Sequence, residues 1–362
     1  MIHPIHEKWA KLLVHYCCAV EQNENVAIHI DSLAEPLARS LYREILQAGA
    51  NPVLRMAYPE ILEDTLEFAT QTFLESEATL ELAEIKTIQS WIRIRAPHNT
   101  KALEASDKSK YSQLLKRQRP ISNIRVNETK WCLSNYPTQA GAQDAGMNLD
   151  DYQRFVYGAM FLFDDDPVKK WQEIHTFQEQ IIKHLQDANI IRIKTEDTDL
   201  TLSVKGRIWK NSAGHHNMPS GEVFTGPIEH SANGKICFQI PSSVSGAEVE
   251  NISLVFKDGQ VVEASAEKGN DMLQAQLNTD KGARFLGELG IGTNYNIQRA
   301  TKQTLFDEKI GGTIHLAVGQ SYKDTGGLND SAIHWDMICD LRQGGAIYVD
   351  GELFQENGQF KL

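Results

Sequence analysis

Cysteine is scarce in this sequence, with five residues among 362, and the number is odd. Two of them, Cys17 and Cys18, are adjacent and cannot easily form a disulfide with each other. Disulfides form in oxidising compartments and are rare in the cytosol. We therefore expect a reduced, cytoplasmic protein.

Long hydrophobic runs are also missing. No window approaches the roughly 20 apolar residues that a membrane-spanning helix needs. The first twenty residues, MIHPIHEKWAKLLVHYCCAV, do not place a basic segment before an unbroken apolar run, as a secretory signal would. We expect neither a membrane anchor nor a signal peptide.

Basic residues are the minority, with 36 Lys and Arg against 48 Asp and Glu, and the formal net charge is −12. No dense basic stretch stands out, and a negative balance repels a phosphate backbone, so nucleic acid is not an expected partner. Hydrophobic residues make up 41% and charged residues 23%, which is typical of a globular protein and excludes extensive disorder.

The length of 362 residues exceeds what one hydrophobic core usually serves, so we expect two domains. In the first half, helical and strand patterns alternate, which predicts an α/β domain with a largely parallel sheet. The expected strands are 26–30, 52–56, 90–95 and 130–134, and the expected helices are 7–20, 33–48, 60–84 and 149–162.

The character of the chain changes after Asp164-Asp-Asp-Pro167, which ends one helix and begins a linking helix over 167–187. Short strands separated by tight turns then dominate, with one helix over 269–280. The expected strands are 190–195, 200–204, 235–239, 252–257, 260–266, 313–318, 333–339 and 346–349. We therefore predict an α/β domain over 1–187 and a mostly β (α+β) domain over 188–362.

Two histidine motifs in the second half could bind metal. His334 and Asp336 are two residues apart on a predicted strand, so their side chains point to the same face and could share one ion or bind two neighbouring ions. The alternative is a surface His–Asp pair. His315 lies in an apolar strand flanked by glycines, where the alternative is a core histidine with a satisfied hydrogen bond.

Two glutamates lie in glycine-rich segments that we interpret as turns. Glu222 is part of P-S-G-E-V-F-T-G-P and Glu288 is part of G-E-L-G-I-G, and glycine allows a backbone to approach a ligand closely. Each could equally be an ordinary surface turn. The order G-x-x-G-x-G lacks the P-loop lysine and the dinucleotide-binding spacing, which excludes a nucleotide site there.

Taken together, these residues supply two imidazoles and three carboxylates without a thiolate. That set suits zinc, cobalt or manganese and is large enough for two ions with bridging carboxylates. Two neighbouring ions clamp a carbonyl and generate hydroxide at neutral pH, which is the chemistry of amide hydrolysis.

Four segments resemble the thermophilic aminopeptidase family, the group of aminopeptidases T and S. They are P-S-G-E-V-F-T-G-P, G-E-L-G-I-G-T-N, G-T-I-H-L-A-V-G-x-S-Y and S-A-I-H-W-D-M. The match spans about 120 residues of the C-terminal half in the family's order, whereas the N-terminal half is similar only in its α/β character.

The resemblance implies a metal-dependent aminopeptidase that acts on peptides with a free N-terminus and forms homodimers. It assigns two divalent ions, zinc, cobalt or manganese, to Glu222, Glu288, His315, His334 and Asp336. It also implies that Tyr322 steadies the tetrahedral intermediate, and Glu288 is our candidate for accepting the proton of the attacking water.

Two other interpretations stay open at this point. One is a different metallohydrolase, such as an amidase or a dipeptidase. The other is a non-catalytic protein with a structural metal. The neighbouring pair His215-His216 is expected to lie in a loop or at a pocket rim rather than to bind metal.

Overall fold

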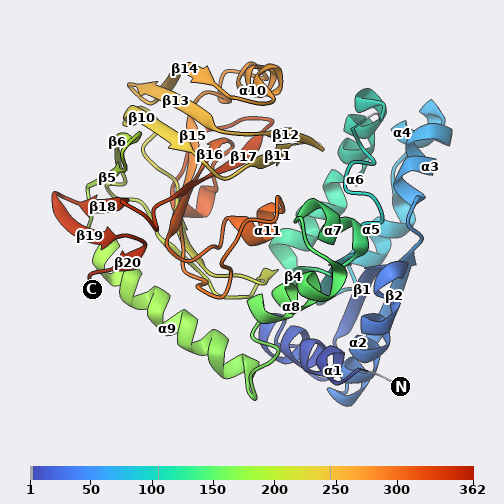
Figure 1. The fold of residues 1–362 in the computed structure, drawn as a ribbon. Coiled ribbons are helices and arrows are strands. Elements are labelled where there is room, and N and C mark those ends of the chain that lie inside the picture. Colours follow the sequence, from blue (N-terminus) through green and yellow to red (C-terminus); the bar gives the residue numbers. More distant parts are fainter. Residues whose placement is uncertain (1–2, 105, 245) are drawn as a thin grey trace. The chain divides into compact units, whose positions relative to one another are not determined.

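The computed structural model describes residues 3–104, 106–244 and 246–362 (Figure 1). The chain forms two compact units: one runs to Lys170 and includes Gly214–Pro219, and the other contains Trp171–Ala213 and Ser220–Leu362. The boundary between the two units lies inside helix α9 (Pro167–Leu185). The predicted division into 1–187 and 188–362 stays a prediction.

The first unit is an α/β layer with a five-stranded, wholly parallel sheet, as the alternating pattern predicts. Strand β1 lies inside this sheet, and its Val26, Ala27, Ile28 and Ile30 are buried, as expected for a parallel strand covered on both faces. The sheet order is β2 (Asn51–Ala57), β1 (Asn25–Asp31), β3 (Ser90–Arg95), β4 (Lys130–Asn135) and β8 (Asn217–Met218).

Strand β8 was not predicted. It comes from the second half of the sequence and pairs with β4 through Leu133 and Asn217. At two residues it is too short to produce a periodic pattern, and only its partner makes it a strand.

The helices of the first unit agree with the predictions except in three places, one of which is the short helix α7 (Gln139–Asp144), which was not predicted. The expected helix over 60–84 is three short helices. Ala69 and Thr70 are extended and separate the first two, and the Thr70 hydroxyl caps the second by accepting from the Phe73 amide; Ser76 is extended and ends the second. Helix α6 (Lys108–Glu128) was missed because it buries no residue and so lacks an apolar stripe. The others are α1 (Pro4–Lys11) with a π-helical continuation (Leu12–Cys17), the 3₁₀ turn Ser32–Ala34, α2 (Glu35–Gln47), α3 (Ile61–Phe68), α4 (Gln71–Glu75), α5 (Thr79–Ile85), α7 (Gln139–Asp144) and α8 (Leu149–Ala159).

The second unit is mostly β, as predicted, with two larger antiparallel sheets that share one hydrophobic core. The eight-stranded sheet has the order β14 (Gln260–Ser265), β13 (Ile252–Lys257), β10 (Asn233–Phe238), β6 (Asp199–Ser203), β5 (Ile190–Lys194), β18 (Ala346–Val349), β19 (Glu352–Glu356) and β20 (Gln359–Phe360). The five-stranded sheet has the order β17 (His334–Asp340), β16 (Thr313–Gly319), β15 (Leu286–Gly292), β9 (Glu222–Thr225) and β7 (Lys210–Ser212). A hairpin of β11 (Ser242–Val244) and β12 (Ala247–Val249), helices α10 (Asn270–Leu277) and α11 (Thr304–Asp307), and the 3₁₀ turn Lys323–Thr325 complete the unit.

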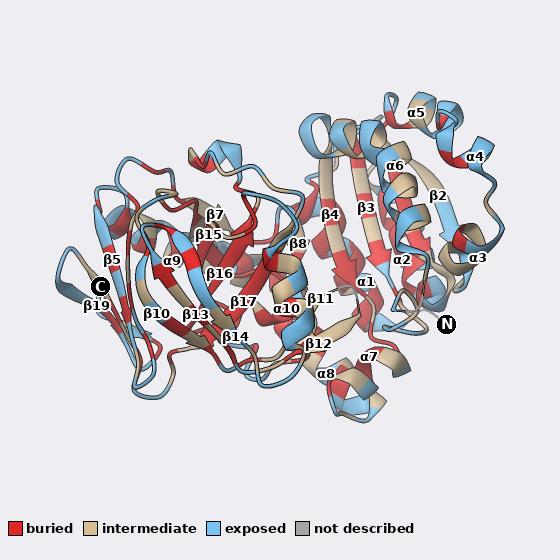
Figure 2. Cartoon of the chain, turned by 90° about the horizontal axis from the view of Figure 1, so that it is seen from above, coloured by how far each residue is buried: buried red, intermediate tan, exposed pale blue. Residues whose placement is uncertain are grey.

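Strands β15 and β16 are buried along their whole length (Figure 2). Alternate side chains of the five-stranded sheet of the second unit enter the shared core. Each such aliphatic side chain contributes about 1.5–3 kcal/mol to stability through burial. They include Leu289 and Ile291 of β15, Leu316 of β16, and Trp335 and Met337 of β17. A slip of one residue in the strand register would move these side chains out of the core. Core packing therefore fixes the register, and the register fixes which side chains lie on the opposite face of the sheet.

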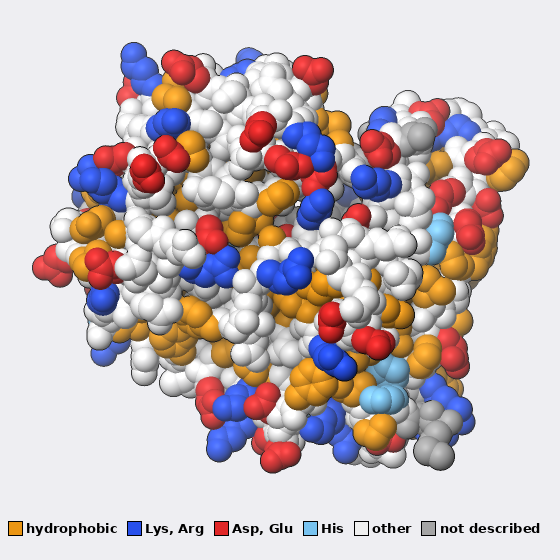
Figure 3. Space-filling model, in the orientation of Figure 1, with side chains coloured by type: hydrophobic (Ala, Val, Ile, Leu, Met, Phe, Trp, Pro, Cys, Tyr) orange, Lys and Arg blue, Asp and Glu red, His pale blue; other side chains and the backbone are white. Residues whose placement is uncertain are grey.

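The visible surface carries charges of both signs. Figure 3 shows acidic and basic side chains interspersed on the face that it presents. Among the described residues, none of the helices combines the length and the apolar character needed to cross a bilayer.

Candidate metal centre

The two glutamates lie on strands, which corrects our interpretation of their segments as turns. Glu222 begins β9, and Glu288 lies inside β15. Glycine is needed on β15 because neighbouring groups leave no room for a side chain. A Cβ atom on Gly290 would lie 2.0 Å from Cε1 and 2.1 Å from Nε2 of His315. Glycine at this position therefore leaves room for the imidazole of the neighbouring strand.

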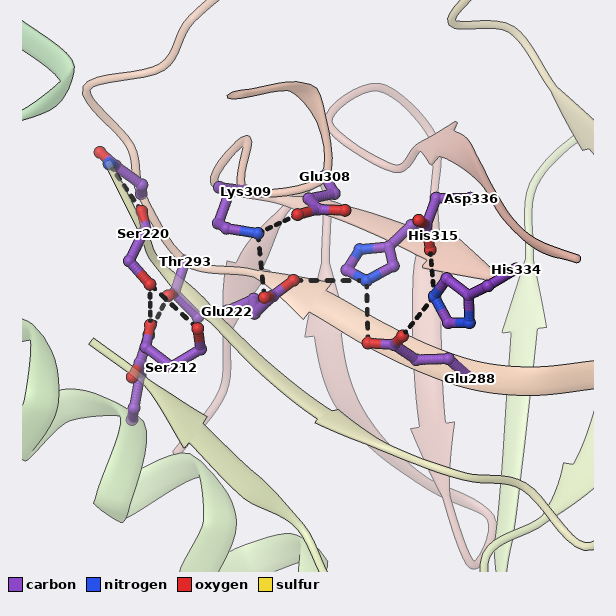
Figure 4. Close-up of polar contacts among 12 residues, drawn as sticks. Ser212, Ser220, Glu222, Glu288, Thr293, Glu308, Lys309, His315, His334 and Asp336 are labelled. Atoms are coloured by element: carbon purple, nitrogen blue, oxygen red, sulfur yellow. Dashed lines mark hydrogen bonds and ion pairs between the residues drawn. The ribbon is translucent and has the colours of Figure 1, made fainter. Parts of the chain in front are cut away.

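Strand pairing brings all five predicted ligands to one region of the sheet. Gly290 pairs with His315, and the next residue of that face, Glu288, pairs with Ala317. Ala317 also pairs with Asp336 on the other side, and Gly292 pairs with Glu222. Small residues thus alternate with the acids and imidazoles, which gives the large polar side chains space to converge (Figure 4).

The five side chains form two groups that share Glu288. In one, Nε2 of His315 lies 3.3 Å from Oε2 of Glu222 and 3.5 Å from Oε1 of Glu288. In the other, Nε2 of His334 lies 3.2 Å from Oε2 of Glu288 and 3.6 Å from Oδ1 of Asp336. Within each group the possible ligand atoms lie within 4.8 Å of one another.

Buried polar atoms in this cluster test whether a metal fits. Oε2 of Glu222 and Oδ1 of Asp336 are buried without a hydrogen-bond partner. Leaving such atoms unsatisfied costs free energy, and a bound cation would remove that cost. The donor set of carboxylate oxygens and imidazole nitrogens suits a divalent transition metal. The residues present therefore fit the metal.

The orientation of His334 also favours metal binding. Its Nδ1 lies 2.8 Å from the carbonyl oxygen of Gln320. Because a carbonyl only accepts, Nδ1 donates the hydrogen, and in the neutral ring the lone pair is on Nε2, toward Glu288 and Asp336. A backbone carbonyl that fixes the tautomer is a usual support of a metal-binding histidine.

The carboxylates dominate the electrostatics of the cluster. Burial alone would lower the pKa of His315, but hydrogen bonding to Glu288 and the charges of Glu222, Glu288 and Asp336 raise it to about 9. Burial opposes ionisation of Glu288, yet the two histidines outweigh it and lower the pKa of this carboxyl. The cluster therefore attracts positive charge, and a divalent ion would replace the protons.

Sequence reasoning missed two residues beside the centre, the buried Lys309 and the partly buried Glu308. Nζ of Lys309 lies 3.0 Å from Oε1 of Glu222 and also donates to Oε1 of Glu308. Burial would lower the pKa of this ammonium, but the two facing carboxylates raise it above its usual range. Glu308 forms a third possible ligand group with His315 and Asp336. A Glu-Lys dipeptide is common on protein surfaces, so no sequence signal marked this pair as part of the centre.

The thermophilic metalloprotease family (M29) matches residues 3–360 of the chain. The chain belongs to this family. It is similar to aminopeptidase 2 of Geobacillus stearothermophilus, with 27% identity over 92% of this chain and 91% of the relative. It is also similar to aminopeptidase PepS of Streptococcus thermophilus, with 26% identity over 95% of this chain and 93% of the relative. The structure of wild-type AmpT from Thermus thermophilus has the same fold, with a TM-score of 0.85, 23% identity and 99% of both chains covered.

Family membership and these relatives establish the enzyme class. The chain is a metallo-aminopeptidase, as the sequence resemblance implies, and its cofactor is a divalent metal. Its substrates are peptides.

Tyr322 lies beside the cluster of this metallo-aminopeptidase. The residue is 47% exposed, and its ring centre lies 5.2 Å from that of His334 and 5.5 Å from that of Phe224. Partial burial and the charges of Glu288 and Asp336 raise its pKa. The phenol therefore keeps its proton at neutral pH and can donate a hydrogen bond.

The pair His215-His216 lies in a loop, and neither residue belongs to the possible metal groups of the described residues. Both pack in the first unit, where His215 lies 4.9 Å from Tyr16 and His216 lies 4.7 Å from Trp131, measured between ring centres. These contacts give both imidazoles a packing role.

Proposed function

We propose that this metallo-aminopeptidase releases N-terminal residues at a centre of two divalent ions. The observation that carries the proposal is the position of Glu288 between two ligand groups. One of its oxygens faces His315 and the other faces His334, as a carboxylate that bridges two ions would require (Figure 4). Glu222 and His315 would complete one ion site, and His334 with Asp336 would complete the other.

The donor set supports zinc, cobalt or manganese, because it combines imidazole nitrogens with carboxylate oxygens and contains no thiolate. When bound, the ions would polarise the scissile carbonyl and supply hydroxide near neutral pH. The carboxylates would also attract a protonated α-amine, which fits removal of residues from a free N-terminus.

Two side chains would act directly on the reacting groups. Glu288 would accept the proton of the attacking water, since its carboxylate faces both ligand groups. The hydroxyl of Tyr322 would donate a hydrogen bond to the oxyanion that develops on the carbonyl oxygen. Its exposure leaves it accessible to a bound peptide.

We also propose a cytoplasmic homodimer. The five cysteines are free, which fits a reducing compartment. The dimer is supported by family resemblance alone.

The test is hydrolysis of leucine p-nitroanilide by the full chain, assayed as isolated, after chelation, and after adding back zinc, cobalt or manganese. We expect activity to disappear with the metal and to return with two ions bound per chain by elemental analysis. N-acetyl-leucine p-nitroanilide should not react, whereas an amidase would accept it. A dipeptidase would cleave Leu-Gly but not Leu-Gly-Gly. A single ion per fully active chain would refute the two-ion centre.

The interpretation as a non-catalytic protein with a structural metal is not supported. The chain belongs to a peptidase family, and its cluster holds more carboxylates than a closed tetrahedral zinc site uses.

A further inference from the structure

Lys309 is a fixed cation at the edge of the candidate centre. It follows helix α11, and its side chain is completely buried. Its backbone is held at both ends, since the Lys309 amide donates to the Phe306 carbonyl and its own carbonyl accepts from the Asn294 amide. A lysine is almost never fully buried unless it is paired, and here its partners are Glu222 and Glu308.

This ammonium occupies one oxygen of each partner. Oε1 of Glu222 accepts from Lys309 at 3.0 Å, whereas Oε2 of the same carboxylate has no hydrogen-bond partner and lies 3.3 Å from Nε2 of His315. Oε1 of Glu308 also accepts from Lys309. Glu222 therefore offers a single oxygen to the centre, and one oxygen of Glu308 is already engaged.

The number of free oxygens matters for the choice of metal. Zinc binds few ligands, usually four, and accepts imidazole nitrogen. Manganese belongs with the metals that prefer carboxylate, carbonyl and water oxygens in an octahedral arrangement. A second oxygen from Glu222 or Glu308 would thus benefit manganese more than zinc.

We propose that Lys309 determines the metal preference of the centre by keeping Glu222 and Glu308 from binding through both oxygens, which favours zinc over manganese. This inference rests on the proposed metal centre. Lys309 acts through the two carboxylates and is a positioning residue.

The experiment measures the ratio of zinc to manganese affinity in the full chain with Lys309→Met. After chelation, the protein is dialysed against mixtures of the two ions, and bound metal is measured by elemental analysis. Both ions carry the same charge, so loss of the ammonium charge affects both affinities alike and cancels in the ratio. We expect the ratio to shift toward manganese by at least about tenfold.

The control is Lys268→Met, which removes an exposed lysine that pairs with Glu248 and Glu250 and should leave the ratio unchanged. If Lys309→Met does not fold, as judged by circular dichroism, the double variant Glu308→Gln/Lys309→Met leaves no unpaired carboxylate at position 308. Its ratio should still shift toward manganese, because the second oxygen of Glu222 is released.

An unchanged ratio in a folded, metal-binding Lys309 variant would overturn this inference alone. A wild-type chain that binds neither metal would overturn the proposed centre and this inference with it.

Discussion

The two oxygens of each carboxylate at the centre have different surroundings. Glu288 directs one oxygen to each histidine, and Glu222 has one oxygen on Lys309 and one facing His315. Tyr322 differs from these residues because its side chain is a phenol whose pKa is raised, so it keeps its proton at neutral pH and is a poor metal ligand. Changes at Tyr322 should therefore affect turnover and not metal binding.

Replacing Tyr322 with Phe should lower kcat about 10²- to 10³-fold, since one oxyanion donor contributes roughly 2.7–4 kcal/mol to the transition state. KM and the number of bound ions should stay close to wild type, because the ring that contacts Phe224 and His334 is retained. Steady-state kinetics and elemental analysis measure these quantities. Tyr348→Phe in β18 is the matched control, and a wild-type kcat in Tyr322→Phe would remove this hydroxyl from the mechanism.

At the scale of elements, the centre depends on one strand that has little side-chain volume on the ligand face. On β15, Gly290 and Gly292 follow Glu288 on that face, while Leu289 and Ile291 fill the core on the other. The strand therefore forms through its core face and its pairing with β9 and β16, not through the propensity of its residues.

Gly290→Ala should displace the imidazole of His315, because the added methyl group would overlap its ring. We expect metal affinity to fall at least about tenfold and the free energy of unfolding to fall by about 1–3 kcal/mol, as for other overpacked cores. Isothermal titration with zinc and urea unfolding measure the two effects. Gly158→Ala is the control, since its Cβ would meet only Phe163 at 3.9 Å. Wild-type zinc affinity in Gly290→Ala would show that the close approach is unimportant.

For the whole molecule, we expect a buried histidine, His6, and a partly buried one, His29, to contribute to the response to acid. Burial, followed by the nearby His3, lowers the pKa of His6 to about 4, and burial lowers the pKa of His29 to about 4. The unfolded chain binds protons at these positions below about pH 6.5, whereas the folded chain does so only near pH 4. Stability should therefore fall as the pH drops through this window.

His6→Phe should make this loss less steep, by up to about 1.4 kcal/mol per pH unit between pH 6.5 and 4. Phenylalanine keeps an aromatic ring against Tyr136 and Tyr157 but does not bind the proton. Urea midpoints at several pH values give the slope, with the exposed His184→Gln as the control. An unchanged slope in His6→Phe would exclude His6 as a source of acid sensitivity.

Local patterns in the sequence were sufficient to predict much of the fold. The strand predicted over 333–339 was correct, and on it Trp335 and Met337 alternate with His334 and Asp336 and face the core, as the period of two requires. The α/β character of the first unit and the β character of the second were also predictable, because apolar periodicity is a property of short segments. The roles of the predicted ligands stay predictions, although the structure brings all five together.

The tertiary structure alone decided the features that depend on distant partners. From the sequence we interpret the segments of Glu222 and Glu288 as turns because glycine and proline surround them, yet pairing with neighbouring strands makes both segments extended. The sequence by itself determined which residue types were available for a metal centre. Strand register and burial decided that Gly290 makes room for His315 and that Lys309 lies against Glu222, because both contacts join residues far apart in the chain.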